Sequence, residues 1–206
     1  DTGYYAPYNR PNVRLVALRR EPIATITTSG IRTAKDDYDV DAIVFATGFD
    51  AMTGAVLAVH PMTGRGGVKL ADAWADGPKT YLGLTVAGFP NLFVLYGPNT
   101  NLGHNSIIYM VEAQADYVIQ AVDALDAHGA QALDVRREVM DAFNVQLQAD
   151  LQNTPWAGDC MSWYKTADGR IPNNWSGSAR QYSRAIARFD AENYRFIPAH
   201  TPEAAE

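Results

Sequence analysis

The stretch "DAIVFATGFD", residues 41–50, has the pattern of a strand in the middle of a sheet. From Val40 to Ala46 it is mostly apolar, as in strands that are buried on both faces, and it then stops at Thr47-Gly48. In open α/β sheets ligands lie beyond the carboxyl ends of strands, where a glycine leaves the backbone open to a cofactor. We therefore predict an α/β fold with a ligand near Thr47 and Gly48, and an ordinary strand exit is the alternative reading.

A second stretch, "FPNLFVLYGPNTNLGHNSIIYM" at residues 89–110, follows the same logic. It predicts a buried strand over 91–99, a break at Gly97-Pro98, a polar loop and then a helix. A helix that begins near Ser106 would aim its free N–H groups and positive dipole end at the same sheet edge. A capped core helix would explain the apolar face of this segment, but not the polar residues that crowd one short turn: Asn99, Thr100, Asn101, His104 and Asn105.

Other segments have strand and hairpin patterns. Residues 13–17 alternate with enough β-branched character for a strand, and "PIATITTSGIRT" at 22–33 predicts a strand, a turn at Ser29-Gly30 and a second strand. Residues 54–72 predict hairpins with "TGRGG" as their turn. These short strands precede the helical part of the chain.

Two long helices and one short helix are predicted after the second stretch. The first is capped by Asn105 or Ser106 and ends at Gly129. The others are expected near 131–152 and 180–188, and the last residues are expected to fray. The apolar face of the first helix repeats at helical spacing: Ile107, Val111, Ala115, Val118, Val122 and Leu125.

The order of elements predicts the closing half of a doubly wound, Rossmann-like domain. The opening strand, glycine turn and helix with the G-x-G-x-x-G fingerprint are absent, and "GRGG" at 64–67 is better explained as a hairpin turn. We expect residues 1–48 to include the return from another domain, 106–152 to be helical and 153–206 to be a loop-rich tail. The chain starts at Asp1 without an initiator methionine, so we interpret it as mid-chain sequence, a fragment or a subunit of a longer polypeptide.

Composition excludes several other classes of function. The 206 residues are 47% hydrophobic and carry a formal charge of −6 without a basic run, which argues against nucleic-acid binding. No apolar run approaches the roughly 20 residues of a membrane helix. The single cysteine, Cys160, suits a reducing, cytoplasmic compartment, and the four scattered histidines predict no metal site.

Taken together, the motifs resemble the C-terminal part of flavin-dependent Baeyer–Villiger monooxygenases. "DTGYYAPYNRPNVRLV", "GIRT", "DAIVFATGFDAMTG", "GGVKLADAWADGPKTYLGLTVAGFPNLFVLYGPNTN" and "SWYKTADGR" occur in the order of that family and cover nearly the whole chain. "GPNTNLGHNSI" followed by "NNWSGSARQY" is more similar to the branch with hydroxyacetophenone monooxygenases than to the cyclohexanone branch.

The resemblance implies two cofactors and a reaction. Such enzymes hold FAD in one nucleotide-binding domain and NADPH in a second. Reduced FAD reacts with O2, and the resulting peroxyflavin converts a ketone to an ester or lactone. The implied cofactor-binding residues are Thr47, Gly48, Asp50, Gly97, Pro98, Asn105, Ser106, Ile107 and, for the nicotinamide cofactor, Trp163. The residues implied to face the ketone substrate are Leu102, Gly103 and His104.

No catalytic residue of the family falls within this chain. The arginine that stabilises the peroxyflavin is expected a few residues before Asp1, and the glycine fingerprints also belong upstream. We therefore expect this chain to need the rest of its polypeptide, or a complementary chain, to bind FAD and to turn over a ketone. A homodimer is left open. Two alternatives also stay open: a fragment of an N- or S-oxidising flavin monooxygenase, and a non-catalytic flavoprotein-like assembly domain.

Overall fold

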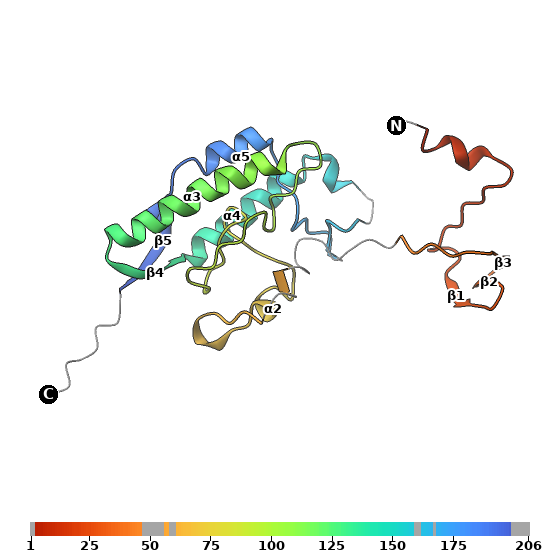
Figure 1. Cartoon of the computed structure of the whole chain (residues 1–206), viewed down its shortest axis with the longest axis horizontal. Coiled ribbons are helices and arrows are strands. Elements are labelled where there is room, and N and C mark those ends of the chain that lie inside the picture. The colour runs from red at the N-terminus through yellow and green to blue at the C-terminus, as the bar shows by residue number, and fades with distance from the viewer. Residues whose placement is uncertain (1–2, 47–55, 58–60, 159–161, 167, 199–206) are drawn as a thin grey trace. The chain divides into compact units, whose positions relative to one another are not determined.

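A computed structural model describes residues 3–46, 56–57, 61–158, 162–166 and 168–198 of the chain. The chain divides into two compact units, Asp1–Phe49 and Asp50–Glu206. Figure 1 shows the elements of both units. Each unit is described by itself below.

The N-terminal unit contains a three-stranded antiparallel sheet. A 3-10 helix, Ala6–Asn9, precedes strands β1 (Ile23–Ile26), β2 (Gly30–Thr33) and β3 (Asp37–Asp39), which pair in chain order. A Cβ on Gly30 would lie 1.9 Å from the carbonyl oxygen of Tyr38 in β3, so the hairpin requires glycine there. The predicted strand, turn and strand over 22–33 are confirmed, and β3 is an element that the sequence pattern missed.

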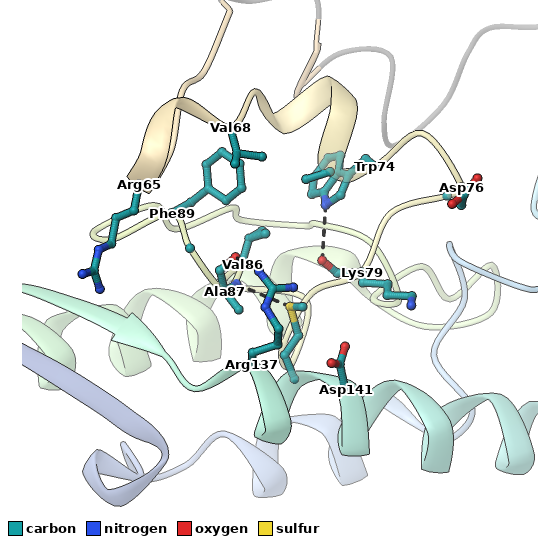
Figure 2. Close-up of a pocket in the computed structure, with 14 residues that line it drawn as sticks. Arg65, Val68, Trp74, Asp76, Lys79, Val86, Ala87, Phe89, Arg137 and Asp141 are labelled. Carbon is teal, nitrogen blue, oxygen red and sulfur yellow. Dashed lines mark hydrogen bonds between the residues drawn. The ribbon is translucent and has the colours of Figure 1, made fainter.

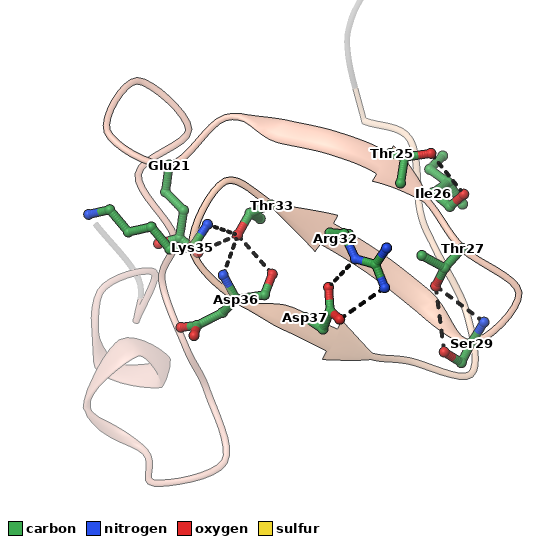
Figure 3. A network of polar contacts seen from close by, with 10 residues as sticks. All are labelled: Glu21, Thr25, Ile26, Thr27, Ser29, Arg32, Thr33, Lys35, Asp36 and Asp37. Carbon is green, nitrogen blue, oxygen red and sulfur yellow. Dashed lines mark hydrogen bonds and ion pairs between the residues drawn. The ribbon is translucent and has the colours of Figure 1, made fainter.

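A polar network ties this sheet to the loop before it (Figure 3). The buried hydroxyl of Thr33 donates to Glu21 Oε1 at 2.7 Å and accepts two backbone N–H groups from the β2–β3 turn. Tyr38 also donates to Glu21 Oε1, at 2.7 Å. These two donors favour the charged carboxylate, so they lower the pKa of Glu21. Arg32 and Asp37 form an exposed ion pair at 2.7 Å across the β2–β3 pair.

Two predicted strands are not observed in this unit. Neither residues 13–17 nor the described residues 41–46 form a strand, and Val44 and Phe45 are 87% and 71% exposed. A central strand needs a hydrogen-bonded neighbour on each side. The described strands of this unit pair only with one another, so the apolar run at 40–46 has no partner among them.

The C-terminal unit packs helices against a two-stranded sheet. Helices α3 (Ile107–Ala127) and α5 (Ala179–Ala185) lie side by side in Figure 1, and α4 (Arg137–Leu151) is a further helix of this unit. Strands β4 (Ala130–Val135) and β5 (Tyr194–Pro198) form the antiparallel ribbon next to α3. The fold of the described residues is thus mixed α and β, with two antiparallel sheets.

Helix α3 begins and ends where the sequence predicts, but it buries a different face. The Ser106 side chain caps it by accepting the N–H of Tyr109 at 3.3 Å. The predicted apolar face is only partly covered, and the fully buried residues are Met110, Gln114, Tyr117 and Ala121. Gln114 can be buried because both polar atoms of its amide are hydrogen-bonded: its Oε1 accepts the N–H of Tyr96 at 2.8 Å and its Nε2 donates to Tyr182 at 2.6 Å.

The second helix is shorter than its predicted range of 131–152. Residues 130–135 form β4, and the second helix begins only at Arg137. β4 is fixed by β5, which lies about 60 residues later in the region predicted as a loop-rich, frayed tail. That pairing is long-range, so local periodicity does not reveal it. The predicted short helix near 180–188 is present as α5, with Ser178 and Gln181 forming a capping box.

The predicted buried strand over 91–99 is replaced by a series of turns. Asn91, Tyr96 and Asn99 have φ angles of 58°, 55° and 64°, which a continuous strand does not accommodate. What remains of the strand is a short antiparallel contact, in which Thr85 pairs with Phe93 and the N–H of Val94 donates to Leu84. A short helix, α2 (Leu70–Ala73), follows the predicted "TGRGG" turn, which is present and closed by a Thr63–Lys69 bridge.

A buried tyrosine network joins this irregular segment to β5. Asp190 accepts hydrogen bonds from the hydroxyls of Tyr81 and Tyr117. Tyr194 in β5 is bonded to Tyr117 at 3.0 Å and to Thr85 at 3.1 Å. Burial raises the pKa of Tyr194 to about 12 and also raises those of Tyr81 and Tyr117. The network therefore holds these hydroxyls in their neutral form while connecting three separate parts of the chain.

Candidate cofactor and substrate site

The first half of the polar loop, residues 97–101, is locked into the interior of the protein. A Cβ on Gly97 would meet the carbonyl oxygen of Gly83 at 2.3 Å, so internal packing already requires this glycine. The Pro98 carbonyl accepts from Thr80 at 3.2 Å, and Thr100 donates to the Gly97 carbonyl at 2.6 Å. The close approach to Gly83 explains the glycine at 97, and the cofactor roles of Gly97 and Pro98 stay a prediction.

An asparagine seam joins this loop to residues 171–175. We use this name for Asn99, Asn101, Asn173 and Asn174. Asn99 Nδ2 donates to the carbonyls of Ile171 and Asn174 at 3.0 and 3.2 Å, and Asn101 Nδ2 donates to Asn174 Oδ1 at 2.8 Å. Backbone bonds run alongside, including Asn101 N–H to the Asn173 carbonyl at 3.0 Å. The seam explains why asparagines crowd the turn.

Four buried polar atoms at the seam have no hydrogen-bond partner within the described part of the chain. They are two carbonyl oxygens and two N–H groups: Asn99 Oδ1, Asn173 Oδ1, Asn174 Nδ2 and Trp175 Nε1. The three asparagines concerned are at most 4% exposed. An unsatisfied buried polar group costs about 1–3 kcal/mol, so such atoms are commonly met by a ligand, water or another segment of protein.

The second half of the loop turns outward. Leu102 is 2% exposed and belongs to the core, whereas Gly103 and His104 are exposed and an added Cβ on Gly103 would meet nothing within 4 Å. Ile107 is half-buried, and Ile108 beside it is 69% exposed. The structure thus brings Gly103, His104 and the N-terminus of α3 to one open surface, and it gives Leu102 a packing role.

Trp163 stands at a small hollow at the other end of the seam. Its ring is 56% exposed and lies edge-on to Tyr164, with centroids 5.9 Å apart. Asn173 Nδ2 donates to the Trp163 carbonyl at 3.1 Å. Both residues line a hollow of about 230 Å³ together with Lys165 and Thr166. Asn173, whose Oδ1 is buried without a partner among the described residues, is therefore one of the residues that line a hollow next to an exposed indole.

Not every predicted site residue can be placed. Thr47, Gly48 and Asp50 lie outside the described residues. Asn105 and Ser106 are at the start of α3, where Ser106 serves as the cap. Asn173 and Asn174 are not among the site residues predicted from the sequence, although they begin the "NNWSGSARQY" stretch of the resemblance, because the contacts that they make across the fold are not visible in the sequence. Among the described residues no cluster of three His, Cys, Asp or Glu side chains is arranged to hold a metal.

None of the helices that the structure describes is long and apolar enough to cross a membrane.

Comparison with known proteins gives a consistent group of relatives, although no family model matches the chain. The chain is 42% identical over 192 residues to the FAD-binding monooxygenase ktnD of Aspergillus niger, covering 90% of this chain and 30% of that protein. It is 40% identical over 206 residues to a Baeyer–Villiger monooxygenase of Pseudomonas aeruginosa, covering 98% and 38%. The chain thus spans about a third of the length of the curated relatives it matches.

Solved structures agree with these relatives. An oxidised steroid monooxygenase bound to NADP is 35% identical, with a TM-score of 0.76 over 97% of this chain and 38% of that one. A closed cyclohexanone monooxygenase is 30% identical, with a TM-score of 0.77 and the same coverage. The OTEMO complex with FAD and NADP has a TM-score of 0.77 over 96% and 37%. The homologues of this chain are therefore Baeyer–Villiger and related flavin monooxygenases that use FAD and NADP, and the chain corresponds to a part of them.

Proposed function

We propose that this chain is the C-terminal part of the FAD-binding domain of an NADPH- and O2-dependent Baeyer–Villiger monooxygenase, which converts ketones to esters or lactones. The proposal includes the doubly wound domain, whose parallel sheet we expect the rest of the polypeptide or a complementary chain to supply. It also includes the hydroxyacetophenone-like branch, because of "GPNTNLGHNSI" and "NNWSGSARQY". A cytoplasmic location and a homodimer are our expectations for the complete protein.

The asparagine seam is the observation that carries this proposal. It ties the loop expected to border the flavin to the segment that holds Trp163, the residue expected to contact the nicotinamide cofactor. The four unpartnered polar atoms at the seam fit a polar group that both donates and accepts hydrogen bonds. If these residues served packing alone, burying four polar atoms without hydrogen-bond partners would cost stability without any benefit.

We assign separate roles to the residues around the seam. The exposed start of α3 presents backbone N–H groups and the positive end of a 21-residue helix, which stabilise negative charge. Gly103 and His104 form the exposed turn in front of it, where a ketone would approach. Trp163 offers an aromatic face and an indole N–H, and Asn173 fixes its backbone. FAD, when bound and reduced by NADPH, supplies the electrons that activate O2.

The test uses the complete polypeptide that contains this chain. We expect the purified protein to be yellow, with a flavin absorption spectrum, and to consume NADPH in the presence of a ketone and O2. In ¹⁸O2, one labelled oxygen atom should enter the ester product, as shown by mass spectrometry. A flavoprotein that oxidises only amines or sulfides, or a protein that never retains flavin, would contradict the proposal.

A further inference from the structure

Two adjoining hollows lie where the "TGRGG" turn meets the start of α4. None of the residues that line them belongs to the asparagine seam. The first, of about 290 Å³, is lined by Arg65, Lys79 and Arg137 among others. Figure 2 shows Arg65 reaching in from the segment before α2 and Arg137 from the first turn of α4. This hollow also contains two carboxylates, Asp76 and Asp141, so its charge is nearly balanced.

The second hollow, of about 240 Å³, is strongly basic. We call it the arginine hollow, and it is lined by four guanidinium groups around one carboxylate: Arg65, Arg136, Arg137, Arg195 and Asp134. All four arginines are exposed, whereas Asp134 is 8% exposed. The chain as a whole is acidic, with a formal charge of −6, so a high overall content of basic residues does not explain the four arginines at this hollow.

Asp134 balances only one of the four arginine charges, and its nearest cationic partner is Arg65. Oδ1 accepts the N–H of Gly88 at 2.8 Å, and Oδ2 lies 3.8 Å from Arg65 Nη1. Arg136 and Arg137 donate only to backbone carbonyls, those of Glu192 at 3.2 Å and Ala87 at 3.4 Å. Carbonyl oxygens orient a guanidinium but carry no net charge. Four arginines and one carboxylate among the described lining residues therefore leave three positive charges uncompensated.

The placement of two of these arginines works against the stability of α4. Arg136 is its N-cap residue and Arg137 its first residue, yet cations are unfavourable at the positive end of a helix dipole. Arg136 provides no side-chain cap for the free N–H groups of the first turn. A bound anion would reverse both penalties, because it accepts hydrogen bonds from guanidinium forks and is attracted by the same helix end.

We propose that the arginine hollow binds a compact anion with two or more negative charges, of the phosphate or pyrophosphate class. Guanidinium groups recognise phosphate oxygens through pairs of parallel N–H groups, and four of them around one small hollow suit a ligand with several oxygens. One dianion or trianion would neutralise most or all of the excess positive charge. This inference does not rest on the proposed function.

The test is calorimetric titration of the complete polypeptide with inorganic pyrophosphate. The protein is first saturated with FAD and NADP+, so that coenzyme phosphate sites are filled. We expect one saturable site at low ionic strength, weakened by salt as counterions compete. Arg137→Gln and Arg195→Gln should each lower the affinity about tenfold, the effect of losing one charge-assisted hydrogen bond. Glycerol 2-phosphate, titrated in parallel, distinguishes an organic phosphate monoester from a free inorganic ion as the ligand.

Arg180→Gln is the matched control, because it removes the same charge from an exposed position on α5 that lines neither hollow. Its affinity for pyrophosphate should stay within twofold of wild type. Circular dichroism establishes that each variant is folded, and all the substituted side chains are exposed. No saturable binding of either phosphate compound, or equal losses in all three variants, would overturn the proposal.

Discussion

Asn173 holds Trp163 through a hydrogen bond of 3.1 Å from its Nδ2 to the tryptophan carbonyl, while its own Oδ1 is buried without a partner among the described residues. If the hollow beside them receives the nicotinamide cofactor, Asn173→Ala removes both an anchor and an acceptor. We expect the affinity of the complete enzyme for NADP+ to fall about tenfold, corresponding to about 1.4 kcal/mol, as measured by fluorescence titration. Asn153→Ala, at an exposed asparagine, is the control. An unchanged dissociation constant for Asn173→Ala would remove this role.

A second prediction concerns the ring of Trp163, which is 56% exposed although it is a large apolar group. Trp163→Ala in the complete enzyme should weaken NADPH binding or uncouple NADPH oxidation from product, releasing hydrogen peroxide. Trp163→Phe keeps an aromatic face but loses the indole N–H, so we expect an intermediate effect. The ratio of NADPH consumed to ester formed measures the coupling. Equal coupling and equal coenzyme affinity in all three proteins would show that the ring has no part in the site.

A third prediction compares Gly97 and Gly103, two glycines of the same loop, of which only Gly97 is required by internal packing. Gly97 has no room for a Cβ, which would lie 2.3 Å from the Gly83 carbonyl, whereas Gly103 has open space. Gly97→Ala should therefore lower the free energy of unfolding by about 1–3 kcal/mol, and Gly103→Ala should change it by less than about 0.5 kcal/mol. Denaturant titration of the complete protein measures both. A neutral Gly97→Ala would mean that the contact with Gly83 relaxes at little cost.

Local patterns in the sequence predicted the elements that depend on near neighbours. The capped start of α3, the hairpin at 22–33 and the "TGRGG" turn each need only a few residues, and each is present. The described residues 41–46 do not form the predicted strand. The hydrophobicity of a segment can be read from its own sequence, whereas its pairing partner cannot. β4 was missed for the same reason, since its partner β5 is about 60 residues away.

The sequence drew attention to one part of the candidate site, and the roles it assigned there stay predictions. The polar turn that begins at Gly97 drew attention by composition, but the structure divides it into a buried half and an exposed half. The contribution of Asn173 depends on two hydrogen bonds that tertiary packing creates, one to nearby Trp163 and one to Asn101 in a distant segment of the chain. Such contacts arise from packing, so no spacing rule along the sequence reveals them.

The last prediction concerns the buried tyrosine network at high pH. Tyr194 is 2% exposed, and its burial raises its pKa to about 12, above the value of about 10 for tyrosine in an unfolded chain. Below pH 10 both states hold the proton, so this group adds no pH dependence. Between pH 10 and 12 the unfolded chain releases a proton that the native protein retains. The free energy of unfolding should therefore fall by up to about 1.4 kcal/mol per pH unit for this tyrosine.

Tyr194→Phe removes one titrating hydroxyl and should make this fall shallower, while Tyr81 and Tyr117 continue to contribute to it. It should cost about 1 kcal/mol at neutral pH from the lost hydrogen bonds to Thr85 and Tyr117. Thr85→Val is the matched control, because it breaks one of the same bonds but leaves the tyrosine. It should lower stability at neutral pH and keep the alkaline slope. Denaturant midpoints from pH 7 to 12 measure both effects. The prediction is contradicted if Tyr194→Phe and the wild-type protein lose stability equally above pH 10. Burial would then not raise the pKa of Tyr194 in the native protein.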